Sequence, residues 1–414
     1  MMDTPHIIII GAGFGGLNVA KHLKDASVRI TMIDRHNYHL FQPLLYQIAI
    51  AGLLPSQIAY PIRTIFRKQK NLTFQMGEVT EINLGAHYVK LNGSVIAYDY
   101  LVVAVGAETN YFGMETIRQE GFEVKDIQKA IKTRNHLLEM FEQADHEADV
   151  KKRRSLLTFV VAGGGPTGVE TAGALAELIS HVMGKDHPDL DLNEARVLLI
   201  EASDHLISFY PDELRRATYR LLKDKKVEIL LDTKLVDFDG QSVTLGDGSK
   251  IATQTLIWTA GIKASPVLAS LGVDQAAAGR VRVESTLQIS SHPEVFALGD
   301  AAYLPDQNGQ PWPMLSTVAI QQGKAAAVNI KHIIKGEPPR VFHYKDPGLL
   351  ATIGRNAAVA RIWGVSFSGF IAWVIWVFLH IYRLIGFRNR ILVFINWVWD
   401  YIFYENQIRL ITKE

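Results

Sequence analysis

The sequence predicts an α/β fold, and three observations lead to this prediction. Over most of the 414 residues, short apolar runs alternate with helical patterns and glycine turns, as in βαβ units with parallel strands. An apolar run followed by a glycine-rich turn and a helical pattern occurs twice, at 7–22 and at 159–178. Near residue 363 the composition changes, and five of the seven tryptophans fall in the last 52 residues. We therefore expect two similar α/β units and a C-terminal segment of different character.

The strand candidates share a short apolar run, and several of them end at Gly or at an acidic residue. They are residues 6–10, 28–33, 100–105, 157–162, 196–200, 255–259 and 295–298. In open parallel sheets, ligands bind outside the carboxyl ends of the strands. The turns that follow these strands are therefore the places where a site is expected.

Composition excludes several classes of function. The 43 Lys and Arg against 42 Asp and Glu leave a formal charge of +1, so no general basic field favours nucleic acid. The chain has no Cys, which rules out disulfides, thiolate metal sites and cysteine nucleophiles, and no metal site is predicted. No basic region precedes the first apolar run, which predicts a strand rather than a signal peptide, so the chain should begin in the cytoplasm.

The first glycine-rich turn is GAGFGG at 11–16. Gly11 and Gly13 allow a tight bend and a close backbone approach to a pyrophosphate, and Gly16 opens a helix whose N-terminus offers unpaired N–H groups. Asp34 ends the second strand candidate, where a carboxylate suits a ribose hydroxyl. One such motif alone can be a tight turn without a ligand, so its position between a strand and a helix is what gives it weight.

The second glycine-rich turn is GGGPTG at 163–168, again between an apolar run and a helical pattern. Gly163, Gly165 and Gly168 stand where the first motif has its three glycines, and Glu201 closes the next strand candidate. No Arg stands immediately beside Glu201, so the site favours NADH over NADPH, whose 2′-phosphate the carboxylate would repel. The chain is therefore predicted to carry two Rossmann-like dinucleotide-binding units.

Two dinucleotide sites in one chain suggest a flavoprotein in which FAD occupies one site and a nicotinamide cofactor the other. Gly106 and Gly261 follow strands at which the chain could cross between domains close to a nucleotide. Asp300 ends the run VFALGD, where it either accepts hydrogen bonds from the ribityl chain of a flavin or caps a helix. Spacing alone leaves both possibilities open.

Seven motifs together resemble those of the type II NADH:quinone oxidoreductases, which are membrane-attached, single-subunit flavoenzymes. In chain order they are GAGFGG, LFQPLLYQIA, VVAVGA, VVAGGGPTGVE, WTAGI, ALGDAA and VAIQQG. The resemblance covers essentially the whole chain, including its apolar aromatic tail. Sulfide:quinone and disulfide reductases share the glycine motifs, but their second half-reaction uses cysteines, which this chain lacks.

The resemblance implies where each cofactor binds. FAD would occupy the first glycine turn, lined also by Val79, Gly106, Asp300 and Ala319, while NADH would occupy the second turn, near Gly261. The family's fold implies an FAD-binding domain of residues 1–112 and 262–350, an NADH-binding domain of residues 113–261 inserted in it, and a membrane-attachment region of residues 351–414.

The resemblance also implies catalytic residues. Glu170 matches a family glutamate close to the flavin and nicotinamide, although on its own it could simply complement a helix dipole. Ala319, Ile320 and Gln321 match the segment that lines the quinone site. Some family members carry another Gln where this chain has Thr317, so quinone preference is left open.

The C-terminal segment predicts membrane attachment. Residues 364–382 carry no formal charge, and residues 391–404 predict an amphipathic helix with Asn389, Asn396, Asp400 and Gln407 on its polar face. Its other face carries Ile391, Phe394, Ile395, Val398 and Ile402. Arg383, Arg388 and Arg390 lie between the two stretches, where they can meet anionic headgroups. We expect helices that lie on the cytoplasmic face of the cell membrane and a homodimer, while a membrane span and a protein interface remain as alternatives.

The predicted reaction is hydride transfer from NADH to FAD, followed by transfer of two electrons to a membrane quinone without proton pumping, since His380 stands alone within 364–382. Two alternatives are a soluble NADH-dependent reductase of a small electron-carrier protein and a membrane-tethered redox-sensing flavoprotein. The densely charged residues 142–155 are interpreted as a solvated helix end and linker that marks a boundary.

Overall fold

The computed structural model describes residues 4–403 and 408–412, and the chain divides into two compact units. The first unit is drawn from Met1–Leu40, Ala59–Glu108 and Ile262–Asp346. The second is drawn from Phe41–Ile58, Thr109–Gly261 and Pro347–Glu414. Compared with the predicted domains, residues 41–58 and the C-terminal segment group with the second unit.

The first unit is built on a six-stranded sheet in the order β21-β22-β9-β1-β2-β5. All of its strands run parallel except β21, so the glycine turn after β1 and the chain after β2, β9 and β22 lie at the same edge. The strands of this sheet are β1 (His6–Ile10), β2 (Arg29–Asp34), β5 (Leu72–Met76), β9 (Tyr100–Val103), β21 (Gln288–Ile289) and β22 (His292–Ala297). The predicted parallel sheet is confirmed, with strand limits that differ by a few residues.

Helices α1 (Phe14–His22) and α11 (Ser316–Ile334) lie against each other in the first unit, and Gly323 permits this approach because a Cβ there would overlap the backbone at Gly15. The smaller elements of this unit are β3 (Tyr38–Leu40), β4 (Ala59–Pro61), α4 (Ile62–Ile65), β6 (Val79–Asn83), β7 (Tyr88–Leu91), β8 (Ser94–Ala97), β10 (Ala107–Thr109), β19 (Ile262–Ala264), β20 (Val281–Arg282), β23 (Ala302–Tyr303) and the 3₁₀ turn η6 (Gly299–Ala301).

The second unit repeats this plan on a five-stranded parallel sheet in the order β11-β18-β12-β13-β14. Its strands are β11 (Phe122–Glu123), β12 (Thr158–Ala162), β13 (Arg196–Ile200), β14 (Glu228–Leu230) and β18 (Thr255–Trp258). Its further elements up to residue 252 are α2 (Leu45–Ala49), α3 (Pro55–Ile58), α5 (Glu115–Glu120), α6 (Ile127–His146), α7 (Val150–Leu156), α8 (Pro166–Leu178), α9 (Gly184–Asp186), η3 (Leu192–Glu194), α10 (Asp212–Asp224), β15 (Leu235–Phe238), β16 (Ser242–Leu245) and β17 (Lys250–Ala252).

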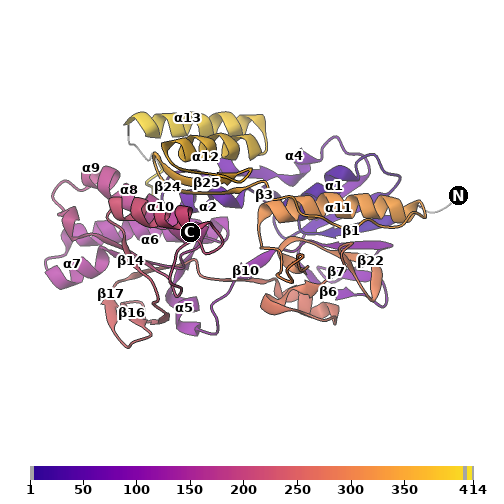
Figure 1. Ribbon diagram of the computed structural model, residues 1–414, viewed down its shortest axis with the longest axis horizontal. Helices are drawn as coiled ribbons and strands as arrows, with labels where there is room; N and C mark the ends of the chain where they lie inside the picture. The colour runs from indigo at the N-terminus through magenta and orange to yellow at the C-terminus, as the bar shows by residue number, and fades with distance from the viewer. Residues whose placement is uncertain (1–3, 404–407, 413–414) are drawn as a thin grey trace. The chain divides into compact units, whose positions relative to one another are not determined.

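The C-terminal part of the second unit is a three-stranded antiparallel sheet followed by two helices. These elements are β24 (Leu349–Gly354), β25 (Ala357–Ile362), β26 (Val365–Gly369), α12 (Phe370–Arg383) and α13 (Phe387–Phe403). Figure 1 shows α13 and α12 over β24 and β25. The uncharged stretch 364–382 is therefore split between a strand and a helix, and no helix within 4–403 or 408–412 has the length and hydropathy that a membrane span demands.

Helix α13 has the amphipathic pattern that the sequence predicts, with its apolar residues outward. Ile391, Phe394, Ile395, Val398 and Ile402 are exposed, whereas Asn389 is buried and Asn396 and Asp400 are half-buried. Tyr404 and Gln407, which the sequence assigns to the same segment, lie outside the described residues.

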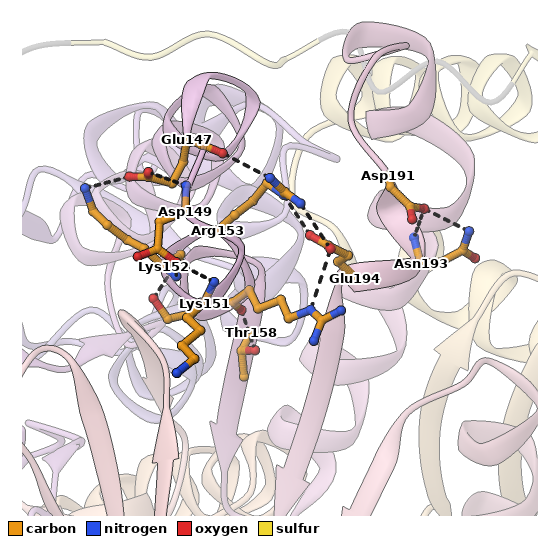
Figure 2. Close-up of polar contacts among 11 residues, drawn as sticks. Glu147, Asp149, Lys151, Lys152, Arg153, Thr158, Asp191, Asn193 and Glu194 are labelled. Atoms are coloured by element: carbon orange, nitrogen blue, oxygen red, sulfur yellow. Dashed lines mark hydrogen bonds and ion pairs between the residues drawn. The ribbon is translucent and has the colours of Figure 1, made fainter.

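The charged stretch 142–155 lies wholly inside the second unit, at the end of α6 and in α7, so the prediction that it marks a boundary is wrong. Its side chains pair with their neighbours, as Figure 2 shows: Arg153 Nε lies 2.8 Å from Glu194 Oε2, and Lys152 Nζ lies 2.6 Å from Glu147 Oε2. A hollow of about 600 Å³ beside this cluster lies at the amino ends of β12 and β13, the edge opposite to the glycine turn. The charged cluster therefore lies away from the predicted site.

Candidate active site

The first glycine turn connects β1 to α1 in a conformation that side chains would obstruct. Gly11 has φ +99°, and a Cβ there would overlap the carbonyl oxygen of Ala104 in the neighbouring strand connection. A Cβ on Gly16 would overlap the carbonyl oxygen of Gly11. Gly13, by contrast, faces open space, with no atom within 4 Å of the position a Cβ would take. The open face of the turn is the face that a pyrophosphate would approach.

Two side chains brace this turn from either side. Asp34 Oδ2 accepts a hydrogen bond from the backbone N–H of Ala12 at 2.7 Å, and its Oδ1 accepts one from His36 N–H at 2.8 Å. His39 donates through Nδ1 to the carbonyl oxygen of Ala12 at 2.8 Å, and burial lowers the pKa of His39 to about 4. Asp34 is thus held at the edge of the sheet by the turn itself.

The remaining predicted residues of the first unit lie along the same edge. Gly106 follows β9 with φ +70° and faces open space, and Asp300 lies in η6, directly after β22. The residue before η6 is Leu298, so Asp300 does not cap a helix N-terminus, which removes one of its two sequence interpretations. Val79 is buried at the start of β6, shortly after β5, whose Met76 pairs with Asp34.

Gln322 is a residue of this edge that the sequence analysis missed. Its Oε1 accepts a hydrogen bond from the N–H of Gly299 at 2.6 Å, whereas its fully buried Nε2 has no partner among the described residues. A buried amide donor left without a partner is costly, so its presence next to Asp300 fits a polar group bound at this edge. The only sequence signal was its position beside Gln321 in the motif VAIQQG.

The second glycine turn repeats the main features of the first. Gly163 has φ +108°, a Cβ on Gly168 would overlap the carbonyl oxygen of Gly163, and Gly165 faces open space. Glu201 Oε2 accepts a hydrogen bond from Gly164 N–H at 2.5 Å, the counterpart of Asp34 on Ala12. The two units therefore offer the same cradle, and each fits a dinucleotide.

Two further features surround the second turn. Glu201 Oε1 accepts hydrogen bonds from both the N–H and the hydroxyl group of Ser203 at 2.8 Å, which fixes the carboxylate. Gly261 has φ +81° after β18, and Phe112 lies where its Cβ would be. The close contact requires glycine at 261, as the motif WTAGI suggests, for packing as well as for conformation.

Glu170 lies in the second turn of α8, and only 8% of its surface is exposed. Its Oε1 accepts a hydrogen bond from Thr352 N–H at 3.3 Å. Burial raises the pKa of Glu170 to about 8, while the Thr352 N–H and the Trp376 side chain act in the opposite direction. Burial and the charge of Glu170 also raise the pKa of Tyr46, which comes from the motif LLYQIA. At neutral pH the carboxyl group of Glu170 is mostly protonated and can exchange a proton.

Ala319, Ile320 and Gln321 lie in the first turns of α11, in the first unit. Ala319 is buried against Gly299. The amide of Gln321 pairs with the backbone of Lys345, donating to its carbonyl oxygen at 2.8 Å and accepting from its N–H at 3.0 Å. One turn earlier, the hydroxyl of Thr317 lies 2.9 Å from that of Tyr344. Both side chains thus attach residues 344–345 to α11.

Comparison with known proteins gives consistent matches along the chain. The family model "Pyridine nucleotide-disulphide oxidoreductase" matches residues 5–323, and the model "NDH2 C-terminal domain" matches residues 347–404. A type II NADH:quinone oxidoreductase of Mycobacterium tuberculosis is 39% identical over 94% of this chain and 87% of its own length. The type II NADH:quinone oxidoreductase of Staphylococcus haemolyticus is 30% identical over 89% of this chain and 92% of its own length.

Among solved structures, that of NDH2 from Plasmodium falciparum in complex with NADH superimposes with a TM-score of 0.91 over 99% of this chain and 100% of that one. At 21% identity this match speaks for the fold alone, and it confirms the predicted α/β architecture. The sequence relatives extend over both units and the C-terminal helices, and they favour neither the electron-carrier reductase nor the redox sensor. The chain belongs to the type II NADH:quinone oxidoreductases, within the pyridine nucleotide-disulphide oxidoreductase family.

Proposed function

We propose that this protein oxidises NADH and reduces a membrane quinone, with FAD bound non-covalently and without proton pumping. The observation that carries the proposal is the pair of matching glycine turns, each open at its middle glycine and each closed by its own carboxylate. When bound, the flavin accepts a hydride from NADH and passes two electrons to a quinone.

The residues of the chain bind and orient these groups. Gly13 leaves room for the FAD pyrophosphate and Gly165 for that of NADH, because neither has an atom near the position of a Cβ. Each carboxylate still has acceptor capacity for a ribose hydroxyl after its backbone bonds, and Glu201 disfavours the 2′-phosphate of NADPH. Glu170 orders the nicotinamide and flavin region.

The first turns of α11 form the polypeptide border of the quinone site. Ala319 and Ile320 supply its wall, and Gln321 borders it with an amide already fixed by Lys345. His380 is the single histidine of the tail, and burial lowers its pKa to about 4 and keeps it neutral, which fits a reaction without proton pumping.

An anaerobic visible spectrum of the detergent-purified protein tests the reaction. One equivalent of NADH should bleach the flavin band, and a soluble quinone should restore it. Bleaching without recovery would contradict the quinone step and favour an electron-carrier protein or a signalling partner as acceptor. A folded preparation without a flavin band would contradict the FAD site itself.

We further propose that α12 and α13 lie on the lipid surface at the cytoplasmic face of the membrane. Large apolar side chains are exposed on both helices, among them Phe378 at 66% and Ile395 at 53%. Arg383 and Arg388 are exposed between the apolar faces, where each basic residue near an anionic surface contributes about 1 kcal/mol. Aromatic and basic side chains in this combination are typical of interfacial helices.

Vesicle sedimentation tests the attachment. The double variant Phe378→Glu with Ile395→Glu should lose binding to anionic vesicles, whereas Val95→Glu should not, because Val95 is 61% exposed but lies on β8 of the first unit. Equal binding of both variants would contradict the proposed surface. Protease access in membrane vesicles of known orientation tests the cytoplasmic face.

We also propose that the protein forms a homodimer. The exposed apolar side chains of α12 and α13 are the surface that a second copy and a membrane would both favour. Sedimentation velocity in detergent and in lipid nanodiscs measures the mass: a dimer in both would support the proposal, and a monomer in nanodiscs would contradict it.

A further inference from the structure

Trp376 is the exception on helix α12, whose other large apolar side chains are exposed or half-buried. It is 2% exposed, whereas Val374 and Phe378, two residues before and after it and so on the opposite face of the helix, are open to solvent. The only other buried residue of this helix is Ala372, at the preceding turn. Helix α12 packs on β24 and β25 through this face, so Trp376 is the large side chain by which the lipid-facing helix enters the body of the second unit.

The contacts of Trp376 hold it in one position. Its ring stacks on that of His380 with the centroids 4.1 Å apart, and lies 5.3 Å from the ring of Trp397 on α13. Trp397 Nε1 donates to Gln47 Oε1 at 3.0 Å, and Gln47 Nε2 donates to the hydroxyl of Tyr46 at 3.1 Å. These contacts join α12 and α13 to α2 and fix the direction of the indole ring.

The indole N–H of Trp376 is buried and makes no hydrogen bond of ordinary geometry with any of the described residues. Helix α12, which carries it, packs on β24, the strand whose Thr352 N–H donates to Glu170. The same indole lowers the pKa of Glu170 against the effect of burial, so it lies near the carboxyl group. The other donor to Glu170 is the Thr352 N–H, and its 3.3 Å bond is long. The pKa of a buried carboxyl group whose two hydrogen-bond donors are far from ideal geometry depends strongly on the positions of those donors.

We propose that Trp376 is a positioning residue for Glu170, because its buried indole N–H stabilises the carboxylate form, so that the packing of α12 on the second unit sets the protonation of this group. The inference rests on the proposed function, in which Glu170 orders the nicotinamide and flavin region. In this proposal one indole N–H connects α12, the helix proposed to lie on lipid, to the carboxyl group of Glu170.

The titratable groups near Glu170 are neutral or paired with other residues, so neutral hydrogen-bond donors determine its pKa. From α2, Tyr46 faces it with a raised pKa, and from α12, His380 is neutral because burial lowers its pKa to about 4. On α8 itself, Glu177 is bound by Lys225 and by the N–H of Arg355. No charged side chain contributes a resolved effect on Glu170, so its acidity depends on burial and on the two donors.

The test is Trp376→Phe, which keeps a stacking ring and removes the N–H. Loss of a donor that favours the carboxylate should raise the apparent pKa of Glu170 by about half a unit to one unit. Two readouts report it: the pH dependence of NADH:quinone turnover, and the infrared band of the protonated carboxyl group that Glu170→Gln removes. Trp373→Phe is the matched control on the same helix, since Trp373 stacks with Phe370 and Tyr401 instead.

The possible results are distinct. A raised pKa in Trp376→Phe but not in Trp373→Phe supports the proposal, and an unchanged pKa in both overturns it while leaving the proposed function intact. If the wild type shows no carboxyl titration that Glu170→Gln removes, the role given to Glu170 in the proposed function is wrong.

A second measurement covers the case in which Trp376→Phe does not fold. In the wild type labelled with 5-fluorotryptophan, the ¹⁹F resonance of Trp376 should titrate with the carboxyl group and stop doing so in Glu170→Gln. A resonance that is insensitive to pH between 6 and 10, about two units either side of the Glu170 pKa of about 8, overturns the proposal.

Discussion

Gly13 and Gly16 lie three residues apart in the first turn but resist substitution for different reasons. A Cβ on Gly16 would overlap backbone, whereas a Cβ on Gly13 would enter open space. Gly16→Ala should therefore lower the melting temperature of the apoprotein, while Gly13→Ala should leave it unchanged and reduce flavin occupancy severalfold. Calorimetry of the apoprotein and flavin content per chain separate the two effects. Normal flavin content in Gly13→Ala would contradict the placement of the pyrophosphate.

Glu170 makes stability depend on pH. Its pKa is about 8 in the folded chain against 4.5 for an ordinary glutamate, so unfolding releases its proton over this interval. Its stabilising contribution is complete below pH 4.5 and is lost as pH rises through 8, at roughly 1.4 kcal/mol for each pKa unit. Glu170→Gln should thus gain melting temperature relative to the wild type between pH 5 and pH 8, and the gain should level off above. A difference independent of pH would contradict the buried carboxyl group.

At the scale of single residues, the sequence predicted those whose role follows from local pattern. The contacts of Asp34 and Glu201 with the two glycine turns follow from a local pattern, because each carboxylate closes the strand that comes after a glycine turn and its helix. Gln322 and Trp376 were missed. The buried amide of the first, and the effect of the second on the carboxyl group of Glu170, depend on contacts between segments that are remote in sequence. No periodicity within the chain reports such contacts.

At the scale of elements, residues 344–345 are bound to helix α11 and occupy the side chain that is predicted to contact the quinone. Gln321 is expected at the quinone site, yet both ends of its amide are bound to Lys345, and Tyr344 is bound to Thr317. The position where some relatives have another Gln is therefore used here to hold residues 344–345.

Removing the hydroxyl group of Tyr344 should weaken the attachment of residues 344–345 to α11. We expect Tyr344→Phe to raise the KM for quinone about threefold to tenfold, the effect of one lost hydrogen bond, with little change in kcat or in NADH oxidation by ferricyanide. Steady-state kinetics with both acceptors measure this. An equal loss with ferricyanide would place the defect at the flavin and not at the quinone.

The parallel strands were the easiest elements to predict, because continuous apolar runs between turns are typical of buried parallel strands. The tail was harder. The uncharged stretch 364–382 suggested one continuous element, but Gly369, with φ +74°, separates β26 from α12. Hydropathy averages over both and does not register the change of direction.

At the scale of the whole molecule, each unit collects pieces from distant parts of the chain. Residues 41–58 belong to the second unit, between two segments of the first, and supply α2, which carries Tyr46 and Gln47 toward the C-terminal helices. The sequence analysis predicted one inserted domain, residues 113–261, but no pattern within residues 41–58 distinguishes this segment from its neighbours in the chain.

The C-terminal helices are therefore part of the second unit and not an appended anchor. Deletion of residues 370–414 would remove Trp376 and uncover β24 and β25, so it should lower the melting temperature and the rate of NADH oxidation as well as membrane binding. Phe378→Glu with Ile395→Glu should lower membrane binding without lowering the melting temperature or the rate of NADH oxidation. Full activity and stability of the deleted protein would contradict this organisation.

Helix α13 has its polar side chains inward: Asn389 is buried and donates to the carbonyl oxygen of Ser56 at 3.2 Å, while Phe394 and Ile395 point outward. With α13 on the lipid surface, as we propose, folding and adhesion to lipid would be encoded by different residues of one helix. Selection can tune the affinity for a bilayer one outward side chain at a time, while the inward side chains preserve the architecture. Lineages with different membranes can thus diverge on the outer face of α13 without any change in how the helix packs on the second unit.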